Sequence, residues 1–146
     1  MKGRRTIHLS IEADFPSVRL LAAACHGVLA EWGLASERRS LLELAVVEAA
    51  TNVVRHAYGG RGGRVEVELA REGTAIALAV VDTGESFDPT LVPPPREPDP
   101  SDPSTWPEGG MGLPIIRAAC DELRYTTDGG KNRLTLHLTV DELEVP

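Results

Sequence analysis

The stretch that decides the fold covers residues 48–58 and reads Glu48-Ala-Ala-Thr-Asn52-Val-Val-Arg55-His56-Ala-Tyr58. It closes a strongly apolar helical run that begins at Ser36, a plausible N-cap, and ends before Gly59-Gly60. Glu48 and Asn52 stand one helical turn apart and therefore share a face, and His56 follows one turn later. This spacing predicts a helix over residues 36–58 that carries a single polar stripe.

The polar stripe has two interpretations. A carboxylate on so apolar a helix costs free energy to bury unless it is paired or used in chemistry. The side-chain oxygen of Asn52 is a suitable ligand for Mg²⁺, a hard ion that prefers oxygen. The alternative is that the stripe faces solvent or a backbone partner, with His56 as a cap or a packed histidine.

A second feature is the run Val81-Asp82-Thr83-Gly84-Glu85-Ser86-Phe87, which follows an apolar segment. An acid at the end of a buried strand, with a glycine two residues later, puts a carboxylate at the edge of a sheet. The glycine lets the backbone there approach a ligand closely. An ordinary strand-ending turn is the alternative.

A third feature is the run Gly109-Gly110-Met111-Gly112-Leu113, which opens a predicted helix with Pro114 in its first turn. Glycines ahead of a helix N-terminus leave backbone N–H groups free to converge on an anion such as phosphate. A tight turn from loop to helix is equally compatible with this run. The run matches neither the Walker pattern nor the Rossmann fingerprint.

The remaining segments predict one sheet with helices on one face, an α+β class of fold. Between Pro89 and Glu108 stand eight of the eleven prolines, which block regular elements, so residues 89–108 are predicted to be a long loop. The other expected elements are strands at 6–11, 64–70, 75–81, 123–126 and 134–140, and helices at 14–33 and from 112 to about 122.

Composition fits a single globular domain over residues 1–146, with 42% apolar and 25% charged residues. The net charge of −7 argues against duplex nucleic acid or an anionic membrane as the main partner. No apolar run approaches the ~20 residues of a membrane span. The two cysteines, Cys25 and Cys120, lie in apolar helical patterns, so buried free thiols and a cytoplasmic location are expected.

Together the three features resemble, in order, the N, G1 and G2 boxes of the GHKL ATPase superfamily. The segments 48–58, 82–89 and 107–113 are more narrowly similar to the bacterial anti-sigma-factor serine kinases. The resemblance implies a Bergerat-type α/β sandwich with a mixed, mostly antiparallel sheet, three main helices on one face, and an ATP lid at about residues 89–108.

The resemblance also implies roles for individual residues. Glu48 would be the general base, Asn52 would ligate Mg²⁺ bridging the ATP phosphates, and Asp82 would accept the adenine amino hydrogen. The residues implied to bind ATP are Asn52, Arg55, His56, Asp82, Gly84, Phe87, Gly109, Gly110, Met111, Gly112 and Leu113. Where the family's last strand often carries a threonine, this chain has Lys131-Asn132-Arg133.

The implied function is an ATP-dependent protein serine/threonine kinase that phosphorylates a STAS-type anti-sigma-factor antagonist, sequesters a sigma factor and forms a homodimer. A nucleotide-gated binding module without kinase activity is the main alternative. A separate catalytic domain of a histidine kinase is a third, weakened because no helical segment with a phosphoacceptor histidine precedes the fold.

Overall fold

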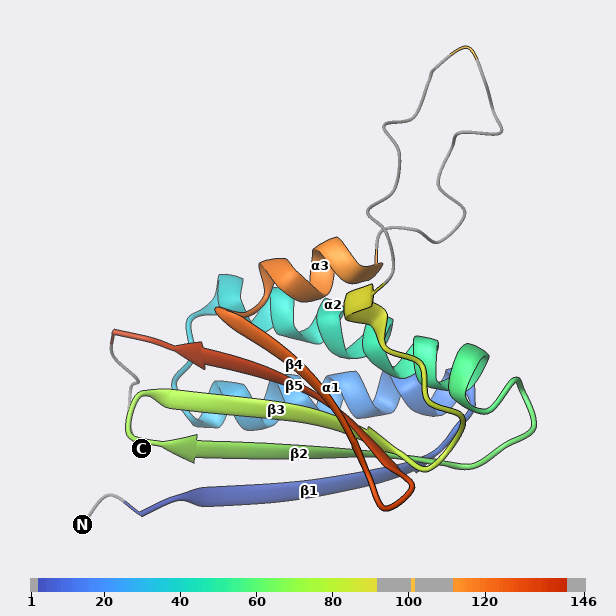
Figure 1. The fold of residues 1–146 in the computed structure, drawn as a ribbon. Coiled ribbons are helices and arrows are strands. Elements are labelled where there is room, and N and C mark those ends of the chain that lie inside the picture. The colour runs from blue at the N-terminus through green and yellow to red at the C-terminus, as the bar shows by residue number, and fades with distance from the viewer. Residues whose placement is uncertain (1–2, 92–100, 102–111, 142–146) are drawn as a thin grey trace.

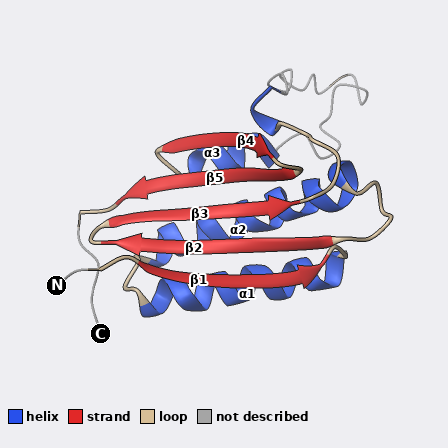
Figure 2. Ribbon diagram, turned by 60° about the horizontal axis from the view of Figure 1, so that its bottom comes forward, coloured by secondary structure: helices blue, strands red, loops and turns tan. Residues whose placement is uncertain are grey.

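The computed structural model describes residues 3–91, 101 and 112–141. Its framework is a five-stranded sheet in the order β1-β2-β3-β5-β4, with every neighbouring pair antiparallel (Figures 1 and 2). The strands are β1 (Arg5–Glu12), β2 (Arg64–Glu72), β3 (Ala75–Asp82), β4 (Glu122–Asp128) and β5 (Lys131–Thr139). The central strand β3 ends at Asp82, so the predicted site lies at one end of the sheet.

The helices cover one face of this sheet, with α2 between α1 and α3 (Figure 1). They are α1 (Phe15–Glu31), α2 (Ser36–Asn52) and α3 (Gly112–Ala118). Helix α2 continues directly into a wider π-helical turn, η1 (Val53–Ala57), and a short 3-10 turn, η2 (Pro89–Leu91), follows the β3 end. None of the helices in these described ranges is both long and apolar enough to cross a membrane.

The core lies between the sheet and the helices, because the strands place alternate side chains inward. Strand β2 contributes Val65, Val67 and Leu69, and β5 contributes Leu134, Leu136 and Leu138, all of them buried. Helix α2 meets them with Leu42, Ala45, Val46 and Ala49. Burying a Val or Leu side chain contributes roughly 1.5–3 kcal/mol, so this layer fixes α2 over the middle of the sheet.

The α+β architecture is confirmed, and the sheet is fully antiparallel where we expected a mixed, mostly antiparallel one. The third helix ends at Ala118 rather than near residue 122. The physical reason is that Ala119 and Cys120 close tight turns onto Ile116 and Arg117, after which the Asp121 N–H already pairs with His137. Of the expected lid, Pro89–Leu91 form a 3-10 turn; residues 92–100 and 102–108 lie outside the described residues.

Candidate functional site

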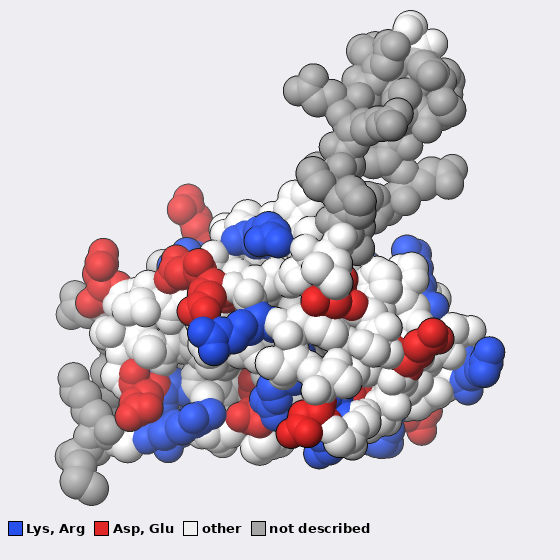
Figure 3. All heavy atoms as spheres, in the orientation of Figure 1, with Lys and Arg blue, Asp and Glu red and all other residues white. Residues whose placement is uncertain are grey.

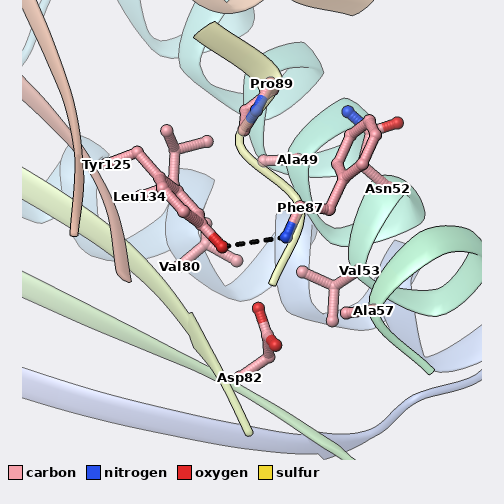
Figure 4. A pocket seen from close by; sticks show the side chains of 10 residues that line it. All are labelled: Ala49, Asn52, Val53, Ala57, Val80, Asp82, Phe87, Pro89, Tyr125 and Leu134. Carbon is pink, nitrogen blue, oxygen red and sulfur yellow. Dashed lines mark hydrogen bonds between the residues drawn. The ribbon is translucent and has the colours of Figure 1, made fainter. Parts of the chain in front are cut away.

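The end of β3 faces a small pocket beside α2. Asp82 is 6% exposed, and Figure 4 shows its carboxylate pointing from the strand into this pocket. The other lining residues are mostly apolar: Ala49, Asn52, Val53, Ala57, Val80, Phe87, Pro89, Tyr125 and Leu134. A buried acid in an apolar pocket is a strong indication of a binding site, because such a group is costly to hold unless a ligand or the protein uses it.

Asp82 is held by two donors. Its Oδ1 accepts the Gly84 N–H at 3.0 Å and an Nδ2 hydrogen of Asn132 at 2.8 Å. Burial raises the pKa of Asp82 above its ordinary value, while the hydrogen bonds from Asn132 and Gly84 oppose that rise. The carboxylate is therefore a fixed acceptor on an otherwise apolar wall.

The loop after Asp82 is bound tightly to the end of the helix. The Glu85 N–H donates to the Ala57 carbonyl at 2.7 Å, and the Tyr58 hydroxyl accepts the Thr83 N–H at 3.0 Å. A Cβ added to Gly84 would lie 2.7 Å from the Ala57 carbonyl carbon, which is too close for any side chain. Gly84 is therefore required by the close approach of this loop to the Ala57 carbonyl, and its expected role beside a ligand stays a prediction.

The π-helical turn places the Ala57 carbonyl where the loop can reach it. Because a π turn is wider than an α turn, it frees carbonyl groups from the regular ladder, and such turns are frequent at functional sites. The Ala57 carbonyl accordingly accepts from Glu85 outside the helix, and Gly60 closes the turn by donating to the Val54 carbonyl at 3.1 Å. The turn joins the polar stripe of α2 to the loop of Asp82.

Glu48 and Asn52 lie half-buried on the predicted common face of α2. Asn52 lines the Asp82 pocket, whereas Glu48 lies one turn earlier, against the start of α3. A Cβ added to Gly112 would come within 2.8 Å of the Glu48 Oε2 atom. Within the described residues neither polar side chain has a hydrogen-bonding partner, so both are available to a ligand.

The pocket itself is narrow, with a volume of about 20 Å³. That is enough for about one water molecule and much too small for a purine ring. The Phe87 ring stacks on the His56 ring with centroids 4.3 Å apart, and the Phe87 N–H donates to the Tyr125 hydroxyl at 3.1 Å. A planar ligand therefore needs more room than this pocket offers.

The remaining predicted residues are spread more widely. The Arg55 guanidinium lies over the Phe15 ring, 5.6 Å from its centroid, and Arg55 does not line the pocket. His56 reaches the site only through its stack on Phe87, and Leu113 is half-buried in the first turn of α3. Gly109, Gly110 and Met111 lie outside the described residues.

The structure also brings in residues that the sequence motifs did not single out. Tyr125 on β4 and Leu134 on β5 line the pocket. Asn132, predicted only as a departure from the family pattern, is 2% exposed and contacts Asp82 directly. The pairing of β3 with β5, which sets Asp82 opposite Asn132, was the signal that could have found it.

A sheet covered by helices on one face, with an acid at the end of its central strand and a Glu/Asn stripe on the central helix, is the arrangement that the resemblance to the GHKL ATPases implies. Comparison with protein families agrees: the histidine kinase-like ATPase domain matches residues 11–138. The chain belongs to this family.

Two named relatives show which kind of family member this chain is similar to. The chain is 28% identical over 149 residues to the serine-protein kinase RsbW of Bacillus thuringiensis (strain Al Hakam) and to that of Bacillus cereus (strain 03BB102). Each alignment covers 99% of this chain and 92% of the relative. The resemblance to the anti-sigma-factor serine kinases is thereby confirmed.

A solved structure shares the fold. It contains the RsbU and RsbW domains of Rv1364c from Mycobacterium tuberculosis and superposes with a TM-score of 0.64 at 21% identity. The match covers 92% of this chain and 32% of that one, so this chain spans about a third of the solved protein.

Proposed function

We propose that this protein is an ATP-dependent serine/threonine protein kinase that phosphorylates a STAS-type anti-sigma-factor antagonist and sequesters a sigma factor. The observation that carries the proposal is the buried Asp82 carboxylate at the end of β3, which shares a pocket with Asn52 of α2, one turn after Glu48. The similarity to serine-protein kinases named RsbW supports the choice of substrate class.

The donors and acceptors of the site, although not the present width of its pocket, suit an adenine nucleotide with Mg²⁺. Asp82 would accept a hydrogen from the exocyclic amine of adenine, and Gly84 would let the ring approach the backbone. Asn52 would offer its side-chain oxygen to Mg²⁺, which neutralises charge on the phosphates. Gly112, at the start of α3, and the preceding Gly109-Gly110-Met111 would line the phosphates. Residues 89–108 are proposed as the lid.

Glu48 is the proposed general base. It lies one helical turn before Asn52 and against Gly112, so it stands between the proposed Mg²⁺ ligand and the proposed phosphate loop. From that position its carboxylate would take the proton of the incoming serine or threonine hydroxyl. General-base assistance contributes about 10²–10⁴-fold in rate and little to ground-state binding.

Two substitutions on the same helix test the assignment. Glu48→Gln should keep Mg²⁺-dependent ATP binding while phosphorylation of the antagonist falls by about a hundredfold or more. Asn52→Ala should instead lose the Mg²⁺-dependent part of nucleotide binding. Glu37→Gln, at the start of α2, is the matched control and should change neither property. Radiolabelled phosphate transfer and calorimetry give the two readouts; transfer at the wild-type rate by Glu48→Gln would contradict the mechanism.

The rival function is a nucleotide-gated binding module without phosphoryl transfer. It requires Asp82, Gly84 and Asn52 but has no use for a carboxylate at position 48. Tight ATP binding by the wild-type protein, with no transfer to any STAS-type antagonist, would favour this rival. The presence of Glu48 beside the start of α3 favours the kinase.

We further propose a cytoplasmic homodimer that meets through the open face of the sheet. Small side chains of β3 lie along the floor of a hollow of about 400 Å³ on that face: Ala75, Ala77 and Ala79. Glu68 on β2 and Arg133 on β5 flank the hollow and form an ion pair across β3 at 3.4 Å.

Two copies packed face to face about a two-fold axis along β3 would cover these small side chains and set β2 of one copy opposite β5 of the other. In the view of Figure 3, Lys and Arg side chains lie among Asp and Glu side chains across the molecule. Sedimentation velocity tests the dimer. A monomer at about 100 µM, well above a typical micromolar dissociation constant, would contradict it.

A further inference from the structure

Asn132 is buried beside Asp82 of the proposed nucleotide site. It lies on β5 directly opposite Asp82 on β3 and is 2% exposed. Its Nδ2 donates to Asp82 Oδ1 at 2.8 Å and to the Gly84 carbonyl at 3.0 Å. Its Oδ1 accepts the Thr127 hydroxyl at 3.1 Å. Asn132 thus links the end of β3, the loop of Gly84 and the β4–β5 hairpin.

The orientation of the Asn132 amide follows from its partners. The Asp82 carboxylate and the Gly84 carbonyl can only accept, so the NH₂ group must face them and the carbonyl oxygen must face Thr127. Both Nδ2 hydrogens are then used inside the protein. Asn132 therefore has no hydrogen left to donate to a ligand base, and any effect it has on a nucleotide must pass through Asp82 or Gly84.

These hydrogen bonds make the two carboxylate oxygens of Asp82 different. Oδ1 accepts two N–H groups, from Gly84 and Asn132. Oδ2 has no partner among the residues that the structure describes, and the carboxylate points into the pocket (Figure 4). With Oδ1 fixed on both sides, the carboxylate cannot turn about its last bond without breaking two hydrogen bonds, so Oδ2 is held toward the pocket.

We propose that Asn132 is a positioning residue that sets the preference of the site for a purine with an exocyclic amine. It does so by fixing Oδ1 of Asp82, which leaves Oδ2 as the single acceptor aimed at that amine. The proposal deepens the proposed function and rests on it, because it takes an adenine nucleotide as the ligand. A threonine at this position has one hydroxyl hydrogen and could serve only one of the two acceptors that Asn132 serves.

The test compares two ligands that differ only at the amine. Purine riboside triphosphate carries the same ring, sugar and phosphates as ATP but lacks the exocyclic amine. Asn132→Ala should weaken ATP binding about tenfold or more, the scale of a charge-assisted hydrogen bond, and should change purine riboside triphosphate binding less than about threefold. In an Asp82→Asn background the same substitution should have almost no further effect on either ligand.

Comparing the two ligands distinguishes a positioning role of Asn132 from a purely structural one. Equal losses for both ligands would show that Asn132 only supports the fold of the site, and unchanged affinities would show that it is dispensable; either result overturns the proposal. Failure of the wild-type protein to bind either triphosphate would instead overturn the proposed function. Calorimetry with Mg²⁺ present measures all the affinities.

Asn132→Asp keeps the shape and gives a second readout if the alanine variant does not fold. In the wild type, acid should reduce the preference for ATP, because a proton on Oδ2 turns the acceptor into a donor. In Asn132→Asp the preference should increase as pH falls from about 8 to about 5, because a shared proton restores the hydrogen bond to Asp82 Oδ1. Tyr125 is the other titratable residue lining the pocket in the described part of the chain. Parallel pH profiles for the two proteins would overturn the proposal.

Discussion

Gly84→Ala is the sharpest test of how the site is built, because one methyl group should disturb both stability and binding. The added Cβ would lie 2.7 Å from the Ala57 carbonyl carbon and 2.9 Å from a Tyr58 ring carbon. The Glu85 N–H bond to Ala57, at 2.7 Å, holds the loop against this obstacle. The loop can therefore make room only by stretching or losing that hydrogen bond.

The expected loss of folding stability in Gly84→Ala has two contributions. Overpacking a tight contact costs about 1–3 kcal/mol, and a lost backbone hydrogen bond costs about 1 kcal/mol. We expect Gly84→Ala to reduce the free energy of unfolding by about 2–4 kcal/mol. ATP affinity should fall as well, because the Gly84 N–H is one of the two donors that hold Asp82 Oδ1.

Gly27→Ala is the matched control. Gly27 lies within α1, and a Cβ added there meets nothing within 4 Å. The same methyl group should raise the free energy of unfolding by about 0.5–1 kcal/mol, because alanine favours the helix over glycine. Urea denaturation of both variants, with calorimetric ATP titration, decides the question. If Gly84→Ala is as stable as the wild type, the close approach of the loop to η1 is not a constraint and the reasoning fails.

Two further predictions concern other parts of the chain. In Gly112→Ala the new methyl group lies 2.8 Å from the movable end of the Glu48 side chain. The free energy of unfolding should therefore change by less than about 1 kcal/mol, whereas phosphoryl transfer should fall about tenfold or more. Unchanged transfer would contradict the assignment of Glu48 as the base. Burial raises the pKa of Cys25 to about 12, so its thiolate is absent at neutral pH. Burial also raises the pKa of Cys120, but this thiol is only half-buried. Iodoacetamide should therefore leave Cys25 of the native protein unmodified, react slowly with Cys120, and modify both thiols in urea; mass spectrometry showing native modification of Cys25 would contradict its burial.

The sequence predicted the elements because their patterns are local. The alternation along β2 and β3 and the apolar run of α2 each lie within one short segment, and their periods of 2 and 3.6 residues are readable without the fold. The proposed Glu48/Asn52 stripe follows from helical spacing alone. An Asp-x-Gly run after a strand likewise indicates close approach of the backbone, but the partner of Gly84, the Ala57 carbonyl, lies in a distant segment and could not be predicted.

The rest depends on contacts between distant segments. Asn132 is 50 residues from Asp82, and only the pairing of β3 with β5 brings them together. The π turn at Val53–Ala57 contains no glycine or proline that would predict it from the sequence. It forms where the loop after Asp82 pairs with Ala57. The end of α3 is set by the Asp121 N–H bond to His137, again a contact across the sheet.

The proposed site divides its work between two rigid elements. Asp82, Gly84 and Asn132 belong to the end of the sheet and would recognise the base, whereas Glu48 and Asn52 belong to α2 and would act on the phosphates. Because each group is held by its own element, substitutions in the sheet should change which nucleotide binds, and substitutions on the helix should change what happens to it. A kinase needs both halves, but a nucleotide-gated binder needs no base on the helix. Glu48 is therefore the residue on which the choice between the two functions depends.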